Sequence, residues 1–277
     1  MKTIKHTLSA LALSLAVIPA TGSAAFLNNW YYDADGVGGN AATQIAEYWD
    51  IVGPSYVKNT FIDANNFTFQ EWGAFVTNAY DGGNPYPAGR QTTGLLSTNG
   101  VGALSNGISF TGGVLDIFSD ALSNFASTAG IYGANDGTNI ATFTVTGGGG
   151  AIDPTGIPNG LITLMAKATY LAPGYFFDSN MVDLSTIVSS PGGLVFGFAT
   201  TNASRVANPT ATVVNEIVGD FAGQLAGYTN VAPGDFIISN NGQFRLSVPE
   251  PGSVALYGIG LLALGLATMK SKRNSQA

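Results

Sequence analysis

The sequence predicts an all-β, β-sandwich-like and glycine-rich exported domain, flanked by an N-terminal signal helix and a single C-terminal transmembrane helix. Short apolar or alternating runs are separated by Gly, Asn, Ser and Thr, and 37 of the 277 residues are Gly. Such runs, when bounded by turn residues, are typical of β-strands. The two ends of the chain differ, because each has a continuous apolar run next to basic residues.

The N-terminal segment has the three zones of a secretory signal peptide. Two lysines precede an apolar run at residues 8–18, and small residues follow it. This run is too short to span a bilayer. Cleavage after Ala25 places Ser23 and Ala25 at the two small positions, and cleavage after Ala24 fits nearly as well. We therefore expect residues 1–25 to be removed by signal peptidase during export; a retained N-terminal helix is the alternative.

The segment between the two ends, residues 26–248, is acidic and long enough for one large β domain or two small ones. Of the 17 acidic residues only Glu250 lies outside it, whereas five of the ten Lys and Arg do. The 16 acidic and five basic residues that remain give a net charge near −11. Such a charge repels nucleic acid and anionic membranes, which makes both poor partners.

The same segment contains neither Cys nor His. The chain has no Cys, and its one His, His6, lies in the predicted signal peptide. This composition excludes disulfides, a Ser-His-Asp triad, a Cys-His pair and a zinc site of the usual ligands. The stability of the domain must therefore come from buried apolar side chains and from backbone hydrogen bonds.

Seven segments of the domain are predicted as strands. Residues 66–76 alternate most clearly, and because aromatic side chains occur on both faces of this segment, we expect it to be covered on both sides. The seven segments are 56–61, 66–76, 107–118, 140–146, 161–171, 194–200 and 243–248.

Residues 45–52 fit two structures. Aromatic and aliphatic side chains recur at i, i+3, i+4 and i+7 from Ile45, which predicts a helix that Gly53-Pro54 ends. The alternative is a first strand that pairs with residues 56–61.

Turn signals are dense along the domain. The four-glycine run at 147–150 is predicted either as a linker between subdomains or as a hairpin or long loop. The other predicted turns lie at 81–85, 135–137, 172–174, 191–193 and 240–242.

Asp33 and Asp35 are the candidate metal ligands, because paired carboxylates before a glycine are typical of Ca²⁺ sites. Read as a helix-loop-helix calcium loop, the segment would have Gln44 at its twelfth position in place of the bidentate glutamate, so it is not that motif. A looser Ca²⁺ site at Asp33 and Asp35 remains as the metal hypothesis. Asp and Gly are also ordinary turn residues, which is the alternative.

Paired carboxylates could also make a secreted carbohydrate-active enzyme. The domain has three glutamates, Glu47, Glu71 and Glu216, and Glu71 lies next to Trp72, which could face a sugar. Glycoside hydrolysis requires two carboxyl groups across one cleft, about 5 to 10 Å apart. An enzyme that uses Glu71 with Glu216 or an Asp is therefore the alternative function, and solvated carboxylates are the simpler interpretation.

The C-terminal segment consists of a structure-breaking motif, an apolar span and a basic stub. Two prolines at residues 249–251 interrupt regular structure. Residues 254–269 carry no charge and would form a helix about 24 Å long, slightly shorter than the hydrocarbon core of about 30 Å. The basic residues at 270–273 favour the cytoplasmic side, which leaves residues 26–248 outside.

This order of parts resembles the PEP-CTERM sorting signal, and the resemblance covers residues 249–273. It implies recognition by exosortase, a membrane protease-transpeptidase of Gram-negative-type bacteria that make exopolysaccharide. It also implies transient anchoring in the inner membrane before delivery to the cell surface or extracellular matrix. A plain single-pass anchor is the alternative. The resemblance assigns the recognition tripeptide to Pro249, Glu250 and Pro251 and the stop block to Lys270, Lys272 and Arg273.

A weaker resemblance connects the middle of the chain to flocculation-associated PEP-CTERM proteins. It implies a non-catalytic role in floc or biofilm formation with exopolysaccharide, and it carries over no catalytic residue. The segments that carry this resemblance are 51–57, 67–69, 114–120 and 174–177.

Overall fold

The computed structural model describes residues 24–37, 42–85, 89–153, 157–190 and 193–249. Most of the predicted signal peptide and the predicted transmembrane helix at 254–269 lie outside the described residues. Within the described part, no helix is both long and apolar enough to cross a membrane. The segment Ala24–Pro249 forms one compact unit.

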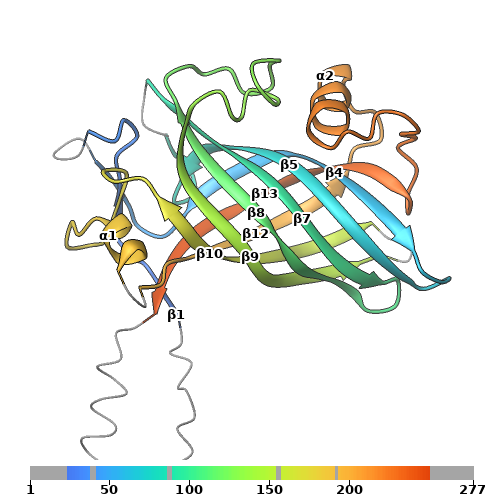
Figure 1. Ribbon diagram of the computed structural model, residues 1–277, viewed down its shortest axis with the longest axis horizontal. Coiled ribbons are helices and arrows are strands. Elements are labelled where there is room, and N and C mark those ends of the chain that lie inside the picture. Colours follow the sequence, from blue (N-terminus) through green and yellow to red (C-terminus); the bar gives the residue numbers. More distant parts are fainter. Residues whose placement is uncertain (1–23, 38–41, 86–88, 154–156, 191–192, 250–277) are drawn as a thin grey trace, which may run out of the picture. The chain divides into compact units, whose positions relative to one another are not determined.

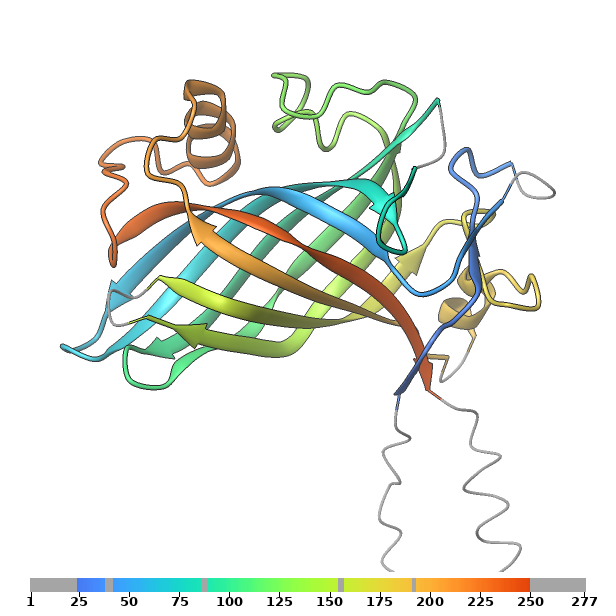
Figure 2. The same cartoon turned by 180° about the vertical axis from the view of Figure 1, so that it is seen from behind.

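The described chain is all-β, and one antiparallel sheet of ten strands dominates it (Figure 1). Eight long strands pair in succession, and the last, β13, returns to the first, β4, so that this part of the sheet closes on itself. Figure 2 shows β13 beside β4. The eight are β4 (Trp49–Phe61), β5 (Asn66–Tyr80), β7 (Gln91–Ala103), β8 (Gly107–Asp120), β9 (Thr138–Ile152), β10 (Pro158–Leu171), β12 (Phe196–Arg205) and β13 (Asp235–Pro249).

Two short strands extend this sheet, and three more form a second one. The strand β6 (Asn84–Pro85) pairs with β5, and β1 (Ala24–Phe26) pairs with the end of β13. The second sheet has the order β11 (Phe176–Phe177), β2 (Trp30–Tyr32) and β3 (Thr43–Ile45).

The prediction of a β-sandwich-like arrangement is corrected, because one barrel-like sheet takes the place of two stacked sheets. A sandwich needs free edges in each sheet, whereas β4 is hydrogen-bonded to β5 on one side and to β13 on the other. Both architectures bury every second side chain of a strand, so alternation in the sequence cannot distinguish them.

The predicted helix at 45–52 is wrong, and so is the pairing in the strand alternative, because the extended residues 49–52 belong to the same strand as residues 56–61. Ile45 ends β3, and Trp49 begins β4, which continues through Pro54 to Phe61. Pro54 is tolerated because the register with β5 passes from Val52 directly to Ser55.

Two predicted turns lie inside strands. The four glycines at 147–150 belong to β9, and residues 240–242 belong to β13. These glycines let neighbouring backbones approach closely: an added Cβ at Gly242 would lie 2.0 Å from the carbonyl oxygen of Thr200. At Gly148 the backbone also has a φ of +119°, which side chains disfavour. The four-glycine run is therefore neither a linker nor a hairpin.

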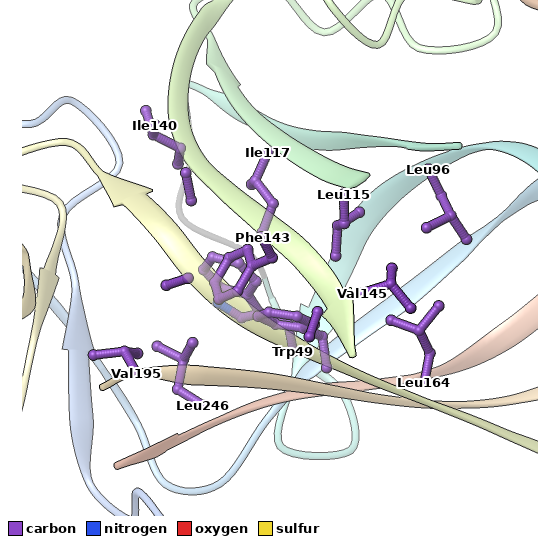
Figure 3. Close-up of a cluster of buried hydrophobic side chains, with 14 of the residues drawn as sticks. Trp49, Leu96, Leu115, Ile117, Ile140, Phe143, Val145, Leu164, Val195 and Leu246 are labelled. Carbon is purple, nitrogen blue, oxygen red and sulfur yellow. The ribbon is translucent and has the colours of Figure 1, made fainter. Parts of the chain in front are cut away.

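The inner face of the closed sheet carries the main hydrophobic core. Alternate residues of each strand point inward, and Figure 3 shows several of them converging from β7, β8, β9 and β10. The small second sheet adds Trp30, Tyr32 and Phe176 to this core at the end where β4 begins.

The outer face is covered on one side by a short helical segment. It comprises α2 (Ala211–Val213), which Thr210 caps, and the π-helical η1 (Val214–Phe221). We call the apolar residues between this segment, the loop 121–137 and the sheet the exterior cluster; it contains Tyr56, Ala74, Leu95, Tyr132, Ala134, Val213, Ile217, Val218 and Ile237. The part of β5 that contains Trp72 and Ala74 is thus covered on both faces, whereas the outward side chains of Asn66, Thr68 and Gln70 are exposed, so the prediction of a strand covered on both sides holds only in part. A further helix, α1 (Leu184–Ser189), is capped by Asp183.

Candidate functional site

The inner face of the closed sheet lines a cavity of about 80 Å³, which we call the interior cavity. Its wall is mainly apolar, and among its lining residues Glu71 is the one with an ionisable carboxyl or amino group. The uncharged polar residues of the lining are Thr77, Thr92, Thr93, Thr201 and Asn240. Figure 3 shows the side chains of Leu96, Leu115 and Leu164 directed into this region. An apolar cavity with few polar groups is the usual form of a small-molecule site.

Trp49 lines the interior cavity next to the second sheet. Its ring is held in place by Trp30 and Tyr32, whose ring centroids lie 5.2 and 4.8 Å away in edge-to-face geometry, and by Phe244 at 5.9 Å. The side chain is 1% exposed, yet its Nε1 has no hydrogen-bond partner among the described residues. The indole N–H is therefore a buried donor without an acceptor.

A hydrogen-bonded series leads across the inner face to Glu71. Thr201 donates from Oγ1 to Asn240 Oδ1 over 3.5 Å, and Asn240 Nδ2 donates to Ser55 Oγ over 2.9 Å. The hydroxyl of Ser55 in turn donates to the Glu71 carboxylate. Four neighbouring strands, β12, β13, β4 and β5, thus contribute one polar side chain each.

Burial controls the charge of Glu71. The loss of water around the side chain raises the pKa of Glu71 from its ordinary 4.5 to about 7, although the hydrogen bond from Ser55 acts in the opposite direction. The side chain also lines a second cavity of about 20 Å³, towards Phe67 and Phe236. Glu71 therefore lines both cavities, and with a pKa of about 7 its carboxyl group is about half protonated at neutral pH.

The two glutamates of the enzyme hypothesis lie on opposite faces of the sheet. Glu71 is on the inner face, whereas Glu216 lies in η1 outside the sheet, where its carboxylate accepts the backbone N–H of Tyr132 over 3.3 Å. Among the described residues that line the two interior cavities, no second carboxylate faces Glu71. The structure thus does not bring together the pair that glycoside hydrolysis would need.

The predicted calcium ligands occupy a turn beside a basic side chain. Asp35 donates its N–H to Asp33 Oδ1 over 3.3 Å and accepts the N–H of Val37 over 3.0 Å. The hydrogen bonds from Val37 and with Asp33, together with the charge of Arg90, hold the pKa of Asp35 below its usual value. In the described part of the chain, no group of three or more His, Cys, Asp or Glu side chains could hold a metal ion. A Ca²⁺ site at Asp33 and Asp35 stays a prediction.

The predicted signal-cleavage site falls at the edge of the sheet. Ala24 and Ala25 belong to β1, where they pair with Pro249 and Val248, and Ser23 lies outside the described residues. Of the predicted sorting residues, Pro249 ends β13, and the others lie outside the described residues: Glu250, Pro251, Lys270, Lys272 and Arg273.

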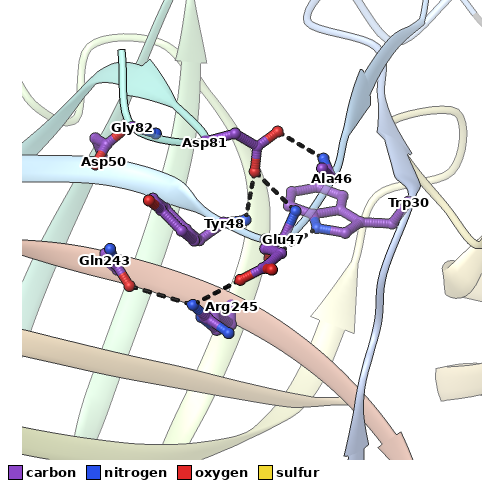
Figure 4. A network of polar contacts seen from close by, with 9 residues as sticks. All are labelled: Trp30, Ala46, Glu47, Tyr48, Asp50, Asp81, Gly82, Gln243 and Arg245. Atoms are coloured by element: carbon purple, nitrogen blue, oxygen red, sulfur yellow. Dashed lines mark hydrogen bonds and ion pairs between the residues drawn. The ribbon is translucent and has the colours of Figure 1, made fainter. Parts of the chain in front are cut away.

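A polar network holds the chain next to this edge (Figure 4). The carboxylate of Asp81 accepts the backbone N–H groups of Ala46, Glu47 and Tyr48 over 2.6, 2.7 and 3.1 Å. Glu47 forms an ion pair of 2.9 Å with Arg245 of β13. Glu47 thus has a structural partner on the outer side of the sheet.

Arg245 also covers Phe26, the first residue of the predicted mature chain. Its guanidinium lies 5.5 Å from the ring centroid of Phe26 and 5.0 Å from that of Tyr48. The ring of Phe26 additionally packs edge-to-face on Phe198 at 5.5 Å. These contacts hold Phe26, the last residue of β1, against β13 and β12.

Sequence reasoning missed Trp49, Ser55 and Asn240 as parts of the site. Only the inward position of Glu71 could have been predicted from the sequence. It lies two and four residues after Phe69 and Phe67 in the same strand, so its side chain is on the same inward face. Its partners come from strands distant in sequence, and their approach depends on how the sheet closes.

Comparisons of the chain with protein-family models, with curated proteins and with solved structures gave no match.

Proposed function

We propose that the chain is an exported, non-catalytic surface or matrix protein that an exosortase sorts and that acts with exopolysaccharide in floc or biofilm formation. The observation that carries the proposal is that the bounds of the compact unit, Ala24–Pro249, nearly coincide with the two predicted processing sites. The compact unit begins at the predicted signal-cleavage site and ends at the predicted sorting tripeptide. Removal of both ends therefore leaves the closed sheet whole.

The contacts at this edge support processing at both ends. Cleavage after Ala25 would leave Phe26 at the new N-terminus, where Arg245 and Phe198 hold its ring. Since β13 is also paired with β4 and β12, loss of two residues of β1 removes few of its hydrogen bonds. A membrane enzyme could act at residues 249–251 without opening the sheet.

The polar groups support a binding or structural role over catalysis. Glu71 lacks a second carboxylate on its face among the described lining residues, and Glu216 is bound in the exterior cluster. The fold offers a closed sheet in an acidic chain, which suits a matrix component that must persist outside the cell without disulfides.

The test is a tagged full chain expressed in a bacterium with and without its exosortase. We expect the mature surface form to lack the segment beyond residues 249–251, and Glu250→Ala to leave export intact while a longer, membrane-bound form accumulates. Ser253→Ala, two residues after the tripeptide, is the matched control and should be processed normally. Mass spectrometry of the surface protein decides, because a C-terminus that still ends at Ala277 contradicts sorting.

The role in aggregation is tested separately by deletion of the gene. The expected result is impaired flocs or biofilm while exopolysaccharide is still made. Normal flocs in the deletion strain would contradict this part of the proposal.

A further inference from the structure

The carboxyl group of Glu71 borders the space inside the closed sheet. Glu71 lies on the inner face of β5 and lines both the interior cavity and the smaller cavity next to it. It is 8% exposed, and because its side chain points inward, the exposed part borders this space. Neither of its oxygens is among the buried polar atoms that lack a partner in the described chain, whereas Trp49 Nε1 is. A molecule in the cavity can therefore contact the carboxyl group, while the indole N–H is enclosed by protein.

The hydrogen bonds beside the cavity run towards Glu71. Thr201 donates to Asn240, and Asn240 donates to Ser55. Ser55 in turn donates to the carboxylate, and it is the one partner of Glu71 among the described residues. A carboxylate has about four acceptor positions, so most of those of Glu71 are open to a donor from a bound molecule.

The threonines of the lining give the cavity its shape more than its chemistry. The hydroxyl of Thr92 is bonded to that of Tyr32 over 2.6 Å, and Thr93 donates to the carbonyl oxygen of Ala134 over 2.7 Å. Thr77 lies on the same face of β5 as Glu71 but about 20 Å further along the strand. Because both residues line a cavity of only about 80 Å³, its space is elongated and suits an unbranched chain.

No cationic side chain balances Glu71 inside the sheet. Among the described residues that line the two cavities there is no Lys, Arg or His, and also no Asp or Tyr. Burial raises the pKa of Glu71 to about 7, so the carboxyl group is mostly ionised at pH 8. A buried anion without a counter-charge is unfavourable, so a cation in the cavity would be bound by it. The net charge of the chain, −7 at pH 7, also attracts cations from solution.

We propose that the interior cavity binds a small primary alkylammonium ion, whose ammonium group pairs with the Glu71 carboxylate and whose unbranched alkyl chain packs on the apolar wall. Leu96, Leu115 and Leu164 supply part of this wall. A metal ion fits less well, because aliphatic side chains cannot replace its oxygen ligands. A cavity of about 150 Å³ holds benzene, so one of about 80 Å³ accommodates roughly three to five non-hydrogen atoms. The inference does not depend on the sorting proposal, because it concerns the inside of the closed sheet alone.

The experiment follows the carboxyl signals of the full chain, labelled with ¹³C-glutamate and held in dodecyl maltoside micelles at pH 8. The probe is n-propylammonium chloride, and Glu71→Gln identifies the signal of Glu71 by its loss. We expect the probe to shift this signal in a saturable manner. Because the ion binds the ionised carboxylate, it should also lower the titration midpoint of Glu71, by about one pH unit at ten times its Kd.

Control ligands separate recognition of the charge from partition into the micelle and from ionic strength. 1-Propanol has the same chain without the charge, propionate has the opposite charge, and sodium chloride supplies a cation without the chain. None of them should shift the Glu71 signal in the range in which propylammonium saturates it. The signal of Glu216, which is buried outside the sheet, should not respond to any of the four. An equal response of Glu71 to 1-propanol or to sodium chloride would overturn the proposal.

Two variants complete the test, with saturation transfer from the protein to the propylammonium methyl protons as the measurement. Glu71→Gln keeps the size of the side chain but removes the charge, and it should weaken binding by more than about tenfold. Glu216→Gln, which changes the buried glutamate outside the sheet, is the matched control and should bind as the unaltered protein does. Ala199→Leu places extra atoms in the lining and should also abolish binding. The proposal is overturned if propylammonium leaves the Glu71 signal of the unaltered protein unchanged, or if Glu71→Gln binds it equally well.

Discussion

Two buried glutamates, one on each side of the same sheet, show how surroundings decide what a carboxyl group can do. Glu71 and Glu216 are almost equally buried, at 8% and 5% exposed. Glu71 borders open space inside the sheet, whereas Glu216 accepts a backbone N–H within the packed exterior cluster. Burial of a carboxyl group alone therefore does not identify a candidate site. What distinguishes Glu71 from Glu216 is the cavity beside its side chain.

The largest expected effect on stability comes from a substitution in the exterior cluster. Ile217 of η1 is fully buried in the exterior cluster, so Ile217→Ala should lower the free energy of unfolding by about 4 kcal/mol through lost burial and a new void. Urea unfolding of the purified protein measures this loss. A change below about 1 kcal/mol would show that the outer helical segment does not pack as described.

The next largest effect is the pH-dependent contribution of Glu71, beside the interior cavity, to the free energy of unfolding. Because the folded-state pKa of Glu71 is raised from 4.5 to about 7, its contribution to stability is fully present below pH 4.5 and is lost as the pH rises through 7. Between pH 4.5 and pH 8 the unaltered protein should therefore lose about 3 kcal/mol relative to Glu71→Gln, which cannot ionise. Urea unfolding at both pH values measures the difference.

Glu216→Gln is the matched control for this experiment, since it changes the other buried glutamate and keeps an oxygen that can accept the N–H of Tyr132. If Glu71→Gln followed the same pH dependence as the unaltered protein, the inner carboxyl would not be enclosed.

The smallest effect belongs to the third glutamate of the domain. Glu47 is 53% exposed in its ion pair with Arg245, so solvent screens the attraction. Glu47→Gln should change the free energy of unfolding by less than about 1 kcal/mol. Thermal unfolding at low and high salt measures it, and a large loss that salt does not reduce would show that the edge near Phe26 depends on this pair.

Alternation along the chain predicted the all-β class and most of the long strands, because every second side chain of these strands is buried. The strand β7 was missed, since among its inward positions only Leu96 carries a large aliphatic side chain, whereas Thr92, Gly94 and Thr98 are small. Those small side chains reduce the apolar signal. They also leave room inside the sheet, and Thr92 and Gly94 border the interior cavity.

The closure of the sheet and the composition of the site could not be predicted from local sequence. The pairing of β13 with β4 joins residues about 180 positions apart, such as Asn240 and Gly53, and no local pattern encodes it. Residues 240–242 have the composition of a turn, yet they lie in β13. The carbonyl oxygen of Thr200 lies so close to Gly242 that a Cβ atom would not fit there. The series from Thr201 to Glu71 exists only because of that pairing.

The most direct test of the enclosed carboxyl is the pH titration of the ¹³C-labelled glutamate side chains of the full chain by NMR. The chain has four glutamates, Glu47, Glu71, Glu216 and Glu250, and Glu71→Gln identifies the carboxyl signal of Glu71 by its loss. We predict that this signal titrates with a midpoint near pH 7, because burial raises its pKa. A midpoint near the ordinary 4.5 would contradict a carboxyl group enclosed by the closed sheet.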